Sequence, residues 1–145
     1  MSFLTPELEA VFDTGARLVH LVTLRADGRP HVPVVWSAVE HGEIVIAHLS
    51  EHQKVKNVRR DRRVALSVAT GGRSANGLDE YVVVEGNARI TEGGAADLLQ
   101  AMAKRYVGPD ATYPLPENPP SGYVTRVVPT KVSGVNPWTH VSRPT

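Results

Sequence analysis

The sequence contains no cysteine, and that absence removes several chemistries at once. Disulfide bonds, thiolate metal sites and cysteine nucleophiles all need a sulfhydryl group, so we exclude all three. A chain without thiols suits a reducing compartment, and we expect a cytoplasmic protein. Its 145 residues are enough for one domain that buries about two thirds of its unfolded surface. We therefore expect residues 1–145 to form a single domain.

Long hydrophobic runs are also missing. No stretch approaches the roughly 18 to 20 apolar residues that a membrane-spanning helix needs. The first residues, MSFLTPELEA, lack the basic segment and following apolar segment of a secretory signal. We expect a protein that is neither exported nor membrane-anchored.

Net charge is small, at +1, but it is unevenly distributed. Residues 54–63 hold six basic side chains and one acid, so the remaining chain is acidic. Such a local concentration suits one compact anion, such as a phosphate, better than a nucleic acid duplex, which rewards many distributed contacts. Aromatic residues are few, which further disfavours single-stranded nucleic acid as a partner.

The first half of the chain has the pattern of a three-stranded antiparallel meander. Asp27-Gly28 and His41-Gly42 are two-residue turn signals between apolar runs at 17–25, 30–40 and 43–49. If both turns are two-residue loops, Trp36 lies between Val19 and Ala47, and Val34 lies between Leu21 and Leu49.

Both faces of this meander are mostly apolar, so both must be covered. A barrel interior on one side and a second copy of the chain on the other would do so, and we expect a homodimer. The alternative cover is the chain's own helices, which we expect at about 5–15 and 93–107. Further strands are predicted at 63–70, 80–91 and 122–135, which makes a mainly β, antiparallel barrel. Residues 108–121 are proline-rich and predict an extended arm that forms a lid or reaches a neighbour.

A basic junction follows the third predicted strand, in the run LSEHQKVKNVRRDRRV. Ser50 or His52 is placed to cap a short helix whose free N–H groups favour an anion, and Lys54 adds a positive charge in its first turn. This arrangement predicts a phosphate site. The alternative interpretation is a solvated basic helix face that packs Val55 and Val58 inward.

Trp36 beside Ala47 is a second candidate feature, since a large ring next to a small residue offers a flat surface for a planar cofactor. A tryptophan on an apolar sheet is more often part of the core. His48 and His52 straddle a strand end rather than share a helix face, so we expect no metal site.

The run GRPHVPVVWSAVEHGEIVIAHLSEHQKVKNVRRDRRVALSV carries a family resemblance. It resembles the cofactor-binding core of the pyridoxamine-phosphate-oxidase-like split β-barrel proteins, particularly their deazaflavin-dependent branch. The likeness spans residues 3–138, and its most specific parts are Lys54-x-x-Asn57 running into RRD, the later VVVEGNARIT and the terminal PTKVSGVNPW.

The resemblance implies a homodimeric split β-barrel in which Lys54 meets the cofactor phosphate. It also implies that Trp138 reaches the cofactor of the other subunit. His52-Gln53 stands where the family usually has serine or threonine followed by arginine, a departure that weakens the expected phosphate grip. The residues expected to bind the cofactor are Pro33, Val34, Val35, Trp36, Ala47, His48, Ser50, His52, Gln53, Lys54, Asn57 and Trp138.

The split barrel accepts FMN, the deazaflavin coenzyme F420 and, in some members, heme. The RRD pattern favours F420, and Lys56, Arg59 and Arg60 suit its long anionic tail, with FMN as the alternative. The expected function is hydride transfer between this cofactor and a small or planar organic substrate. The alternative is a cofactor carrier without turnover. We assign no catalytic residue, and solvent, His48 and His52 stay open as proton sources.

Overall fold

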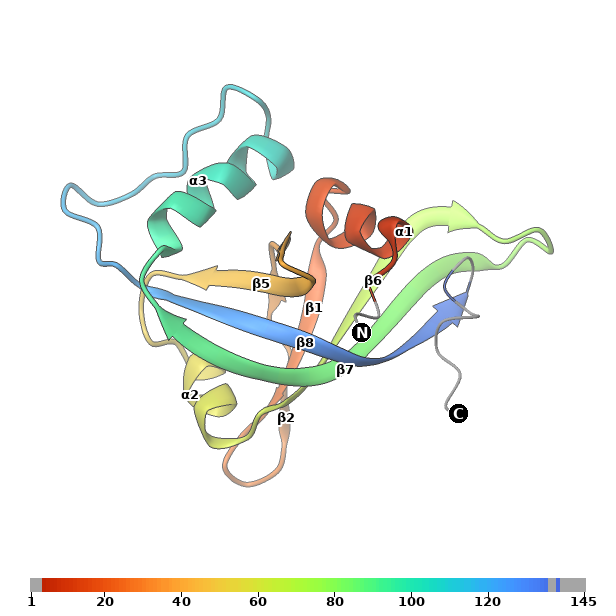
Figure 1. Ribbon diagram of the computed structural model, residues 1–145, viewed down its shortest axis with the longest axis horizontal. Coiled ribbons are helices and arrows are strands. Elements are labelled where there is room, and N and C mark those ends of the chain that lie inside the picture. Colours follow the sequence, from red (N-terminus) through yellow and green to blue (C-terminus); the bar gives the residue numbers. More distant parts are fainter. Residues whose placement is uncertain (1–3, 136–137, 139–145) are drawn as a thin grey trace.

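The computed structural model describes residues 4–135 and 138 (Figure 1). Within them, eight strands form one antiparallel sheet in the order β2-β1-β6-β7-β8-β5-β4, and β3 also pairs with β1. The strands are β1 Val19–Leu24, β2 Pro30–His31, β3 Val34–Val35, β4 Ala38–Glu40, β5 Glu43–His48, β6 Arg63–Arg73, β7 Asp79–Glu92 and β8 Tyr123–Val135. The helices are α1 Pro6–Glu9, continued by the π-helix η1 Ala10–Thr14, then α2 Gln53–Arg60 and α3 Ala95–Tyr106. The predicted mainly β, antiparallel split barrel is confirmed.

The register of the first hairpin differs from the prediction by one residue. The Arg25 N–H donates to the Arg29 carbonyl at 2.8 Å, which closes a three-residue loop rather than a two-residue one. Gly28 takes the left-handed position of that loop, with φ +86°. Val19 consequently lies opposite Val35, and the predicted pairing of Val19 with Trp36 is wrong. Because neighbouring strand residues point to opposite faces, this shift places Val35 on the buried face and leaves Val34 exposed.

The predicted middle strand is also broken into three pieces. β2 and β3 pair with β1, whereas β4 pairs with β5 through the expected two-residue turn at His41-Gly42. Pro33 has no N–H to give to a ladder, which favours a break there. Beyond it the chain turns to the helices: the Ser37 N–H donates to the Tyr106 hydroxyl at 3.0 Å. The predicted position of Trp36 between two paired strands is therefore wrong.

The chain's own helices cover much of the sheet. From the N-terminal segment, Leu8 and Phe12 are fully buried in the main core with Ile44 and Ile46. On the other face of β5, Val45 packs in a second cluster with Met102 of α3, which lies over that strand (Figure 1). The predicted alternative cover is confirmed for β5. No helix among the described residues is both long and apolar enough to cross a membrane.

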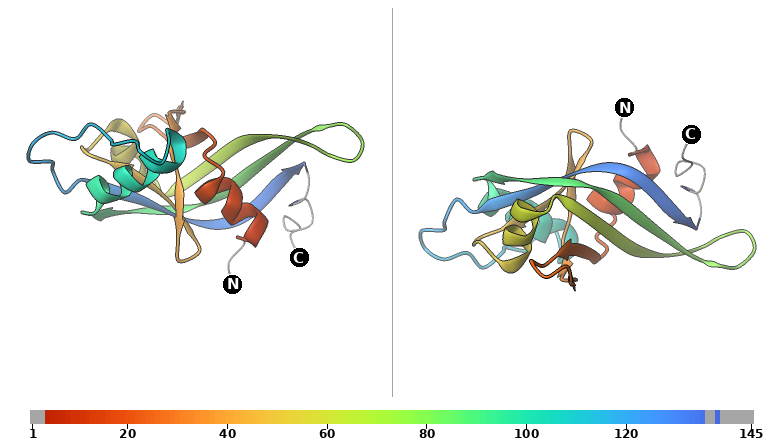
Figure 2. Two further views of the ribbon diagram at one scale, coloured as in Figure 1. Left: turned by 90° about the horizontal axis from the view of Figure 1, so that it is seen from above. Right: turned by 90° about the horizontal axis from the view of Figure 1, so that it is seen from below.

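The predicted arm is present, since residues 108–122 contain no helix or strand. It folds back beside α3, where the Lys104 ammonium donates to the Ala111 carbonyl at 3.4 Å. The β6–β7 hairpin extends from the opposite end of the molecule, away from α3 and the arm (Figure 2). Asn136 and Pro137 of the C-terminal motif lie outside the described residues.

Candidate functional site

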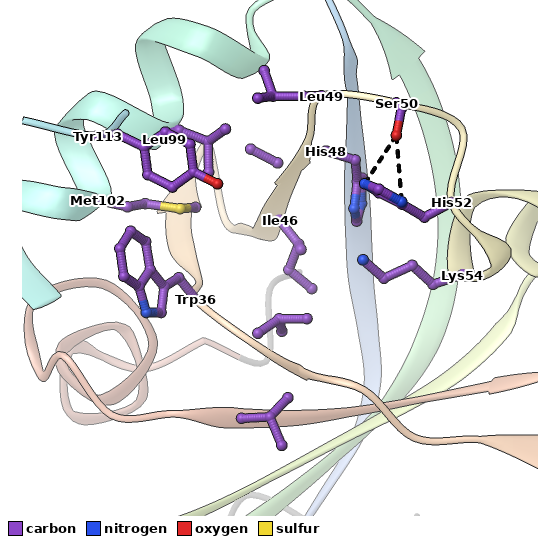
Figure 3. A pocket seen from close by; sticks show the side chains of 13 residues that line it. Trp36, Ile46, His48, Leu49, Ser50, His52, Lys54, Leu99, Met102 and Tyr113 are labelled. Atoms are coloured by element: carbon purple, nitrogen blue, oxygen red, sulfur yellow. Dashed lines mark hydrogen bonds between the residues drawn. The ribbon is translucent and has the colours of Figure 1, made fainter. Parts of the chain in front are cut away.

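A cavity of about 480 Å³ opens where β3, β5, the start of α2, α3 and the arm meet (Figure 3). It has a polar end near α2 and an aromatic end near α3. The lining residues are Val34, Val35, Trp36, Ile46, Ala47, His48, Leu49, Ser50, His52, Lys54, Leu99, Met102 and Tyr113.

Most of the residues expected to bind a cofactor line this cavity, although they come from three different parts of the fold. They are Val34, Val35, Trp36, Ala47, His48, Ser50, His52 and Lys54. These residues line one cavity even though the register differs from the prediction. Trp36 lies in the break between β3 and β4, and its side chain forms part of the cavity wall. Their role in cofactor binding stays a prediction.

Four expected residues lie elsewhere. The Pro33 carbonyl accepts a hydrogen bond from the Leu21 N–H at 3.0 Å. Asn57 is fully buried, and its amide donates to the Thr23 hydroxyl at 3.0 Å and accepts from Gln53 at 2.7 Å. Asn57 therefore ties α2 to β1 and Gln53 bonds to Asn57 within α2, and neither side chain lines the cavity.

Trp138 is the fourth, and it is 2% exposed. Its indole N–H donates to the Tyr81 carbonyl at 2.6 Å, on β7. The expected contact between Trp138 and the cofactor of a second copy stays a prediction.

A lid was one of the two expectations for the arm, but the sequence predicted none of the cavity residues that α3 and the arm contribute, which are Leu99, Met102 and Tyr113. The apolar stripe of α3 predicted packing, and it gave no sign that part of the stripe lines a cavity. Tyr113 did carry a signal, because it is the single aromatic residue of the proline-rich arm.

The polar end of the cavity carries unneutralised positive charge. Lys54 is partly buried, and no ion pair or hydrogen bond of its ammonium occurs within the described part of the chain. Burial lowers the pKa of Lys54, and burial together with the Lys54 charge lowers the pKa of His52. None of the described lining residues is acidic. An anion would supply the missing partner.

The start of α2 adds to this preference. His52 occupies the N-cap position, but its side chain makes no capping hydrogen bond. Its ring instead lies 3.1 Å from the Ser50 hydroxyl. An uncapped helix N-terminus presents free N–H groups and a partial positive charge, both of which favour an anion.

Two of the other basic residues of α2 are already engaged. Arg59 pairs with Glu51 at 2.5 Å and lies over the ring of Tyr123, 5.1 Å from its centroid. Arg60 donates to the carbonyl of Leu24. Of the three residues expected to meet an anionic cofactor tail, exposed Lys56 alone makes no such contact within residues 4–135.

His48 lies between the two ends of the cavity and is 2% exposed. Its Nε2 is 2.7 Å from the Thr125 hydroxyl oxygen, and its Nδ1 is buried without a partner in the described residues. Burial, followed by the charges of Lys54 and His52, lowers the pKa of His48 to about 3. His48 is therefore neutral near pH 7 and cannot serve there as a cationic acid.

The aromatic end offers a flat apolar wall. Trp36 stacks on Tyr106 with centroids 5.1 Å apart and an interplanar angle of 14°. Tyr113 meets the Trp36 ring edge to face at 6.0 Å. A planar ring with an anionic substituent therefore fits the cavity, with the ring toward Trp36 and the anion toward Lys54. Among the described residues, no three potential metal ligands of the His, Asp or Glu type lie close enough to hold an ion.

Solved structures share this architecture. An F420 reductase is 27% identical, with a TM-score of 0.69, over 89% of this chain and 98% of its own. A conserved hypothetical protein of Mycobacterium tuberculosis is 26% identical, with a TM-score of 0.67, over 90% of this chain and 84% of its own. General stress protein 26 of Bacillus anthracis, at 21% identity and a TM-score of 0.61 over 90% and 93% of the two chains, shares the fold.

None of the curated proteins matches this chain in sequence. The family description of pyridoxamine 5'-phosphate oxidase, however, matches residues 4–136, which is nearly the whole sequence. With the split barrel and its neighbours, this match establishes that the chain belongs to the pyridoxamine 5'-phosphate oxidase family.

Proposed function

We propose that the protein is an oxidoreductase that uses the deazaflavin F420, with FMN as the alternative cofactor. The observation that carries the proposal is the difference between the two ends of the cavity: Lys54, which has no ion-pair partner in the described part of the chain, lies at one end, and an aromatic wall lies at the other. The similarity to an F420 reductase supports F420 as the first choice.

Different residues bind the anionic part and the ring of the cofactor. Lys54, His52 and the free N–H groups of α2 hold the anionic part of the cofactor. Trp36, Ile46 and Ala47 contact its ring and exclude water from one side. When bound, the cofactor supplies the hydride chemistry, and the protein supplies orientation toward a small or planar organic substrate.

A homodimer is part of the proposal. The outer face of β1 and β6 carries no charged side chain at its central positions, and the residues of this face are all at least partly exposed in the described chain. The water-facing side of an antiparallel sheet normally carries charged and polar side chains. Because this face carries few of them, we infer that a second copy of the chain covers it. The partly exposed or exposed residues of this face are Leu18, His20, Val22, Ala65, Ser67 and Ala69.

A cofactor carrier without turnover is the second candidate, and the neutrality of His48 favours it. A histidine with a pKa of about 3 supplies no proton near pH 7, and no acidic side chain lines the described cavity. Stopped-flow mixing of the loaded, reduced protein with enones and quinones separates the two functions. A carrier leaves the cofactor reduced throughout, whereas a reductase oxidises it.

Titration of the purified protein with F420 and with FMN, followed by tryptophan fluorescence, tests the proposal. Trp36 lines the cavity and Trp138 is buried elsewhere, so the pair provides a reporter and an internal control. We expect F420 to quench the fluorescence, Trp36→Phe to remove most of that quenching, and Trp138→Phe to preserve it. Binding of FMN without F420 would reverse the cofactor assignment, and binding of neither would overturn the function.

A further inference from the structure

The hydroxyl group of Tyr113 is the feature of the cavity that the proposed function leaves unused. Its oxygen points from the arm into the space between the aromatic end and His48 (Figure 3). No hydrogen bond of this hydroxyl occurs within the described residues, although the ring packs against Trp36. A hydroxyl that is aimed into a cavity and has no protein partner is available to a ligand.

The neighbouring Tyr106 shows the contrast. Its ring also packs on Trp36, but its hydroxyl accepts from the Ser37 N–H at 3.0 Å and donates to the Arg17 carbonyl at 2.8 Å. Tyr106 therefore joins α3 to the rest of the fold, and its hydroxyl proton is already donated within the protein, so it is not available to a ligand. The two tyrosines share one aromatic cluster but differ in what their hydroxyl groups can do.

Gln100 holds Tyr113 in place. Its side-chain amide donates to the Tyr113 carbonyl at 3.0 Å, and its carbonyl oxygen accepts from the Tyr113 N–H at 2.8 Å. Two hydrogen bonds to the backbone of one residue fix its position, even though the surrounding arm has no regular structure. Gln100 lies on α3, so the hydroxyl is presented from a rigid element.

The position of Tyr113 along the cavity indicates what it would contact. Lys54 lies at the opposite end, and the residues between them are apolar or neutral. A cofactor anchored through its anion at Lys54 would have its ring, rather than its anion, near the Tyr113 hydroxyl, so a substrate that meets the ring would come within reach of that hydroxyl. A phenol hydroxyl donates well to a carbonyl oxygen.

We infer that Tyr113 is a substrate-binding residue whose hydroxyl donates a hydrogen bond to the carbonyl oxygen of a planar α,β-unsaturated ketone or aldehyde. Gln100 is its positioning residue. This inference rests on the proposed function, since the reduced cofactor supplies the hydride.

The chemistry balances with these components. Hydride from the reduced cofactor forms a C–H bond at the β-carbon of the substrate, and the cofactor is oxidised by two electrons. The electron pair of the C=C bond moves onto the carbonyl oxygen, where negative charge develops beside the Tyr113 hydroxyl. Water at the cavity mouth then protonates the α-carbon, which gives the saturated carbonyl compound. A donor aimed at developing oxyanion charge stabilises this transition state.

The first test detects the hydrogen bond between the Tyr113 hydroxyl and a bound ketone by absorbance, without turnover. Benzylideneacetone, an aryl enone, absorbs at longer wavelength when its carbonyl accepts a hydrogen bond. We expect a red shift when it binds to the protein loaded with oxidised F420, and loss of that shift in Tyr113→Phe, which keeps the ring on Trp36. Failure of the probe to bind, or a shift that persists in Tyr113→Phe, would overturn the inference.

The second test is kinetic. With reduced F420, Tyr113→Phe should lower kcat for benzylideneacetone by about tenfold or more, up to the roughly 100-fold to 1,000-fold loss that removal of one oxyanion donor causes. KM and the F420 dissociation constant should change much less. Gln100→Leu should reduce both the red shift and kcat, whereas Gln100→Glu, which keeps the acceptor for the Tyr113 N–H, should restore part of each.

The tests separate this inference from the proposed function. If wild-type protein binds no F420, the proposed function fails before Tyr113 is examined. If F420 binds and the Tyr113→Phe variant reduces the enone as fast as wild type, the cofactor assignment stands and the inference is wrong.

Discussion

At the scale of single residues, Lys54 is the side chain that most directly links the structure to the proposed anionic ligand. Its ammonium is partly buried beside two histidines and has no acidic partner in the described chain, so the free protein holds an uncompensated charge. Burial of such a charge is unfavourable unless an anion completes the site. The residue is therefore better explained by a ligand than by the stability of the fold.

Substitution of this lysine gives the first prediction. Lys54→Ala should weaken F420 binding by about tenfold or more, because it removes a charge-assisted contact, while the melting temperature stays the same or rises. Lys131→Ala is the matched control, since Lys131 is exposed on β8, does not line the cavity and is not among the residues expected to meet the cofactor tail. Fluorescence titration measures both. Equal losses in the two variants would place the anion elsewhere.

The second prediction concerns His48 and pH. Its pKa in the folded state is lowered to about 3 from a usual 6.5, so the unfolded chain takes up this proton first as the pH falls. The stability associated with neutral His48 is therefore complete above about pH 6.5 and is lost toward pH 3, at up to about 1.4 kcal/mol per pH unit. Urea unfolding between pH 7 and pH 4.5 should show a flatter pH dependence in His48→Gln than in wild type.

An exposed histidine provides the control for that experiment. His41 is exposed in the turn between β4 and β5, outside the face of β1 and β6. His41→Asn, which suits the left-handed φ of +52° there, should keep the steep acid dependence of wild type. Parallel curves for wild type and His48→Gln would mean that burial of His48 does not govern acid stability.

At the scale of elements, Gly122 fixes how the arm enters β8 beside the cavity. It has φ +69°, and a Cβ atom there would lie 2.4 Å from the His48 carbonyl oxygen and 2.5 Å from the Ala95 Cβ. Strand end, helix start and arm meet at this residue with no space for a side chain. The close approach of β5 and α3, which shapes the cavity, therefore depends on a glycine.

The third prediction follows from that contact. Gly122→Ala should lower the free energy of unfolding by about 3 kcal/mol, because backbone strain adds to a steric clash with main-chain atoms. Gly93→Ala isolates the strain: Gly93 has φ +86° but no atom within 4 Å of its missing Cβ, and about 1 kcal/mol is expected. Denaturant unfolding of both variants gives the comparison. Equal losses would show that the clash is relieved by a small shift.

At the scale of the whole molecule, the uncharged outer face of β1 and β6 governs assembly. Ser67 lies at its centre, opposite His20 on β1 and Val83 on β7. A carboxylate introduced there would lose its hydration in a dimer and would keep it in a monomer. The face therefore gives a direct test of whether two copies pair through it.

The fourth prediction is that Ser67→Glu converts the protein from dimer to monomer in sedimentation equilibrium. Ala75→Glu, in the exposed loop of the β6–β7 hairpin, adds the same charge and should leave the dimer intact. A wild-type protein that sediments as a monomer, or a Ser67→Glu variant that stays dimeric, would remove this face as the interface.

Local patterns were sufficient to predict much of this protein. Alternating apolar runs and turn residues predicted the strands, and the proline content predicted the arm, because such signals act between near neighbours. The basic junction at Lys54 also follows from adjacent residues, as a strand end, a polar turn and a helix start are consecutive in sequence. The predicted phosphate site could therefore be located from the sequence, before the residues packed around it were known.

The tertiary structure decided what depends on distant segments. One extra residue in the first loop moved Val35 to the core, and no local signal separates a two-residue from a three-residue Asp-Gly loop. Asn57, expected near the cofactor, instead holds α2 to β1 through Thr23, a residue 34 positions away. Tyr113 reaches the cavity because Gln100 binds its backbone. The sequence alone determines the residue types and the local turns, strands and helices, because these depend on near neighbours. Burial, charge neutralisation and the cavity depend on the tertiary structure, because they arise when segments far apart in sequence pack together.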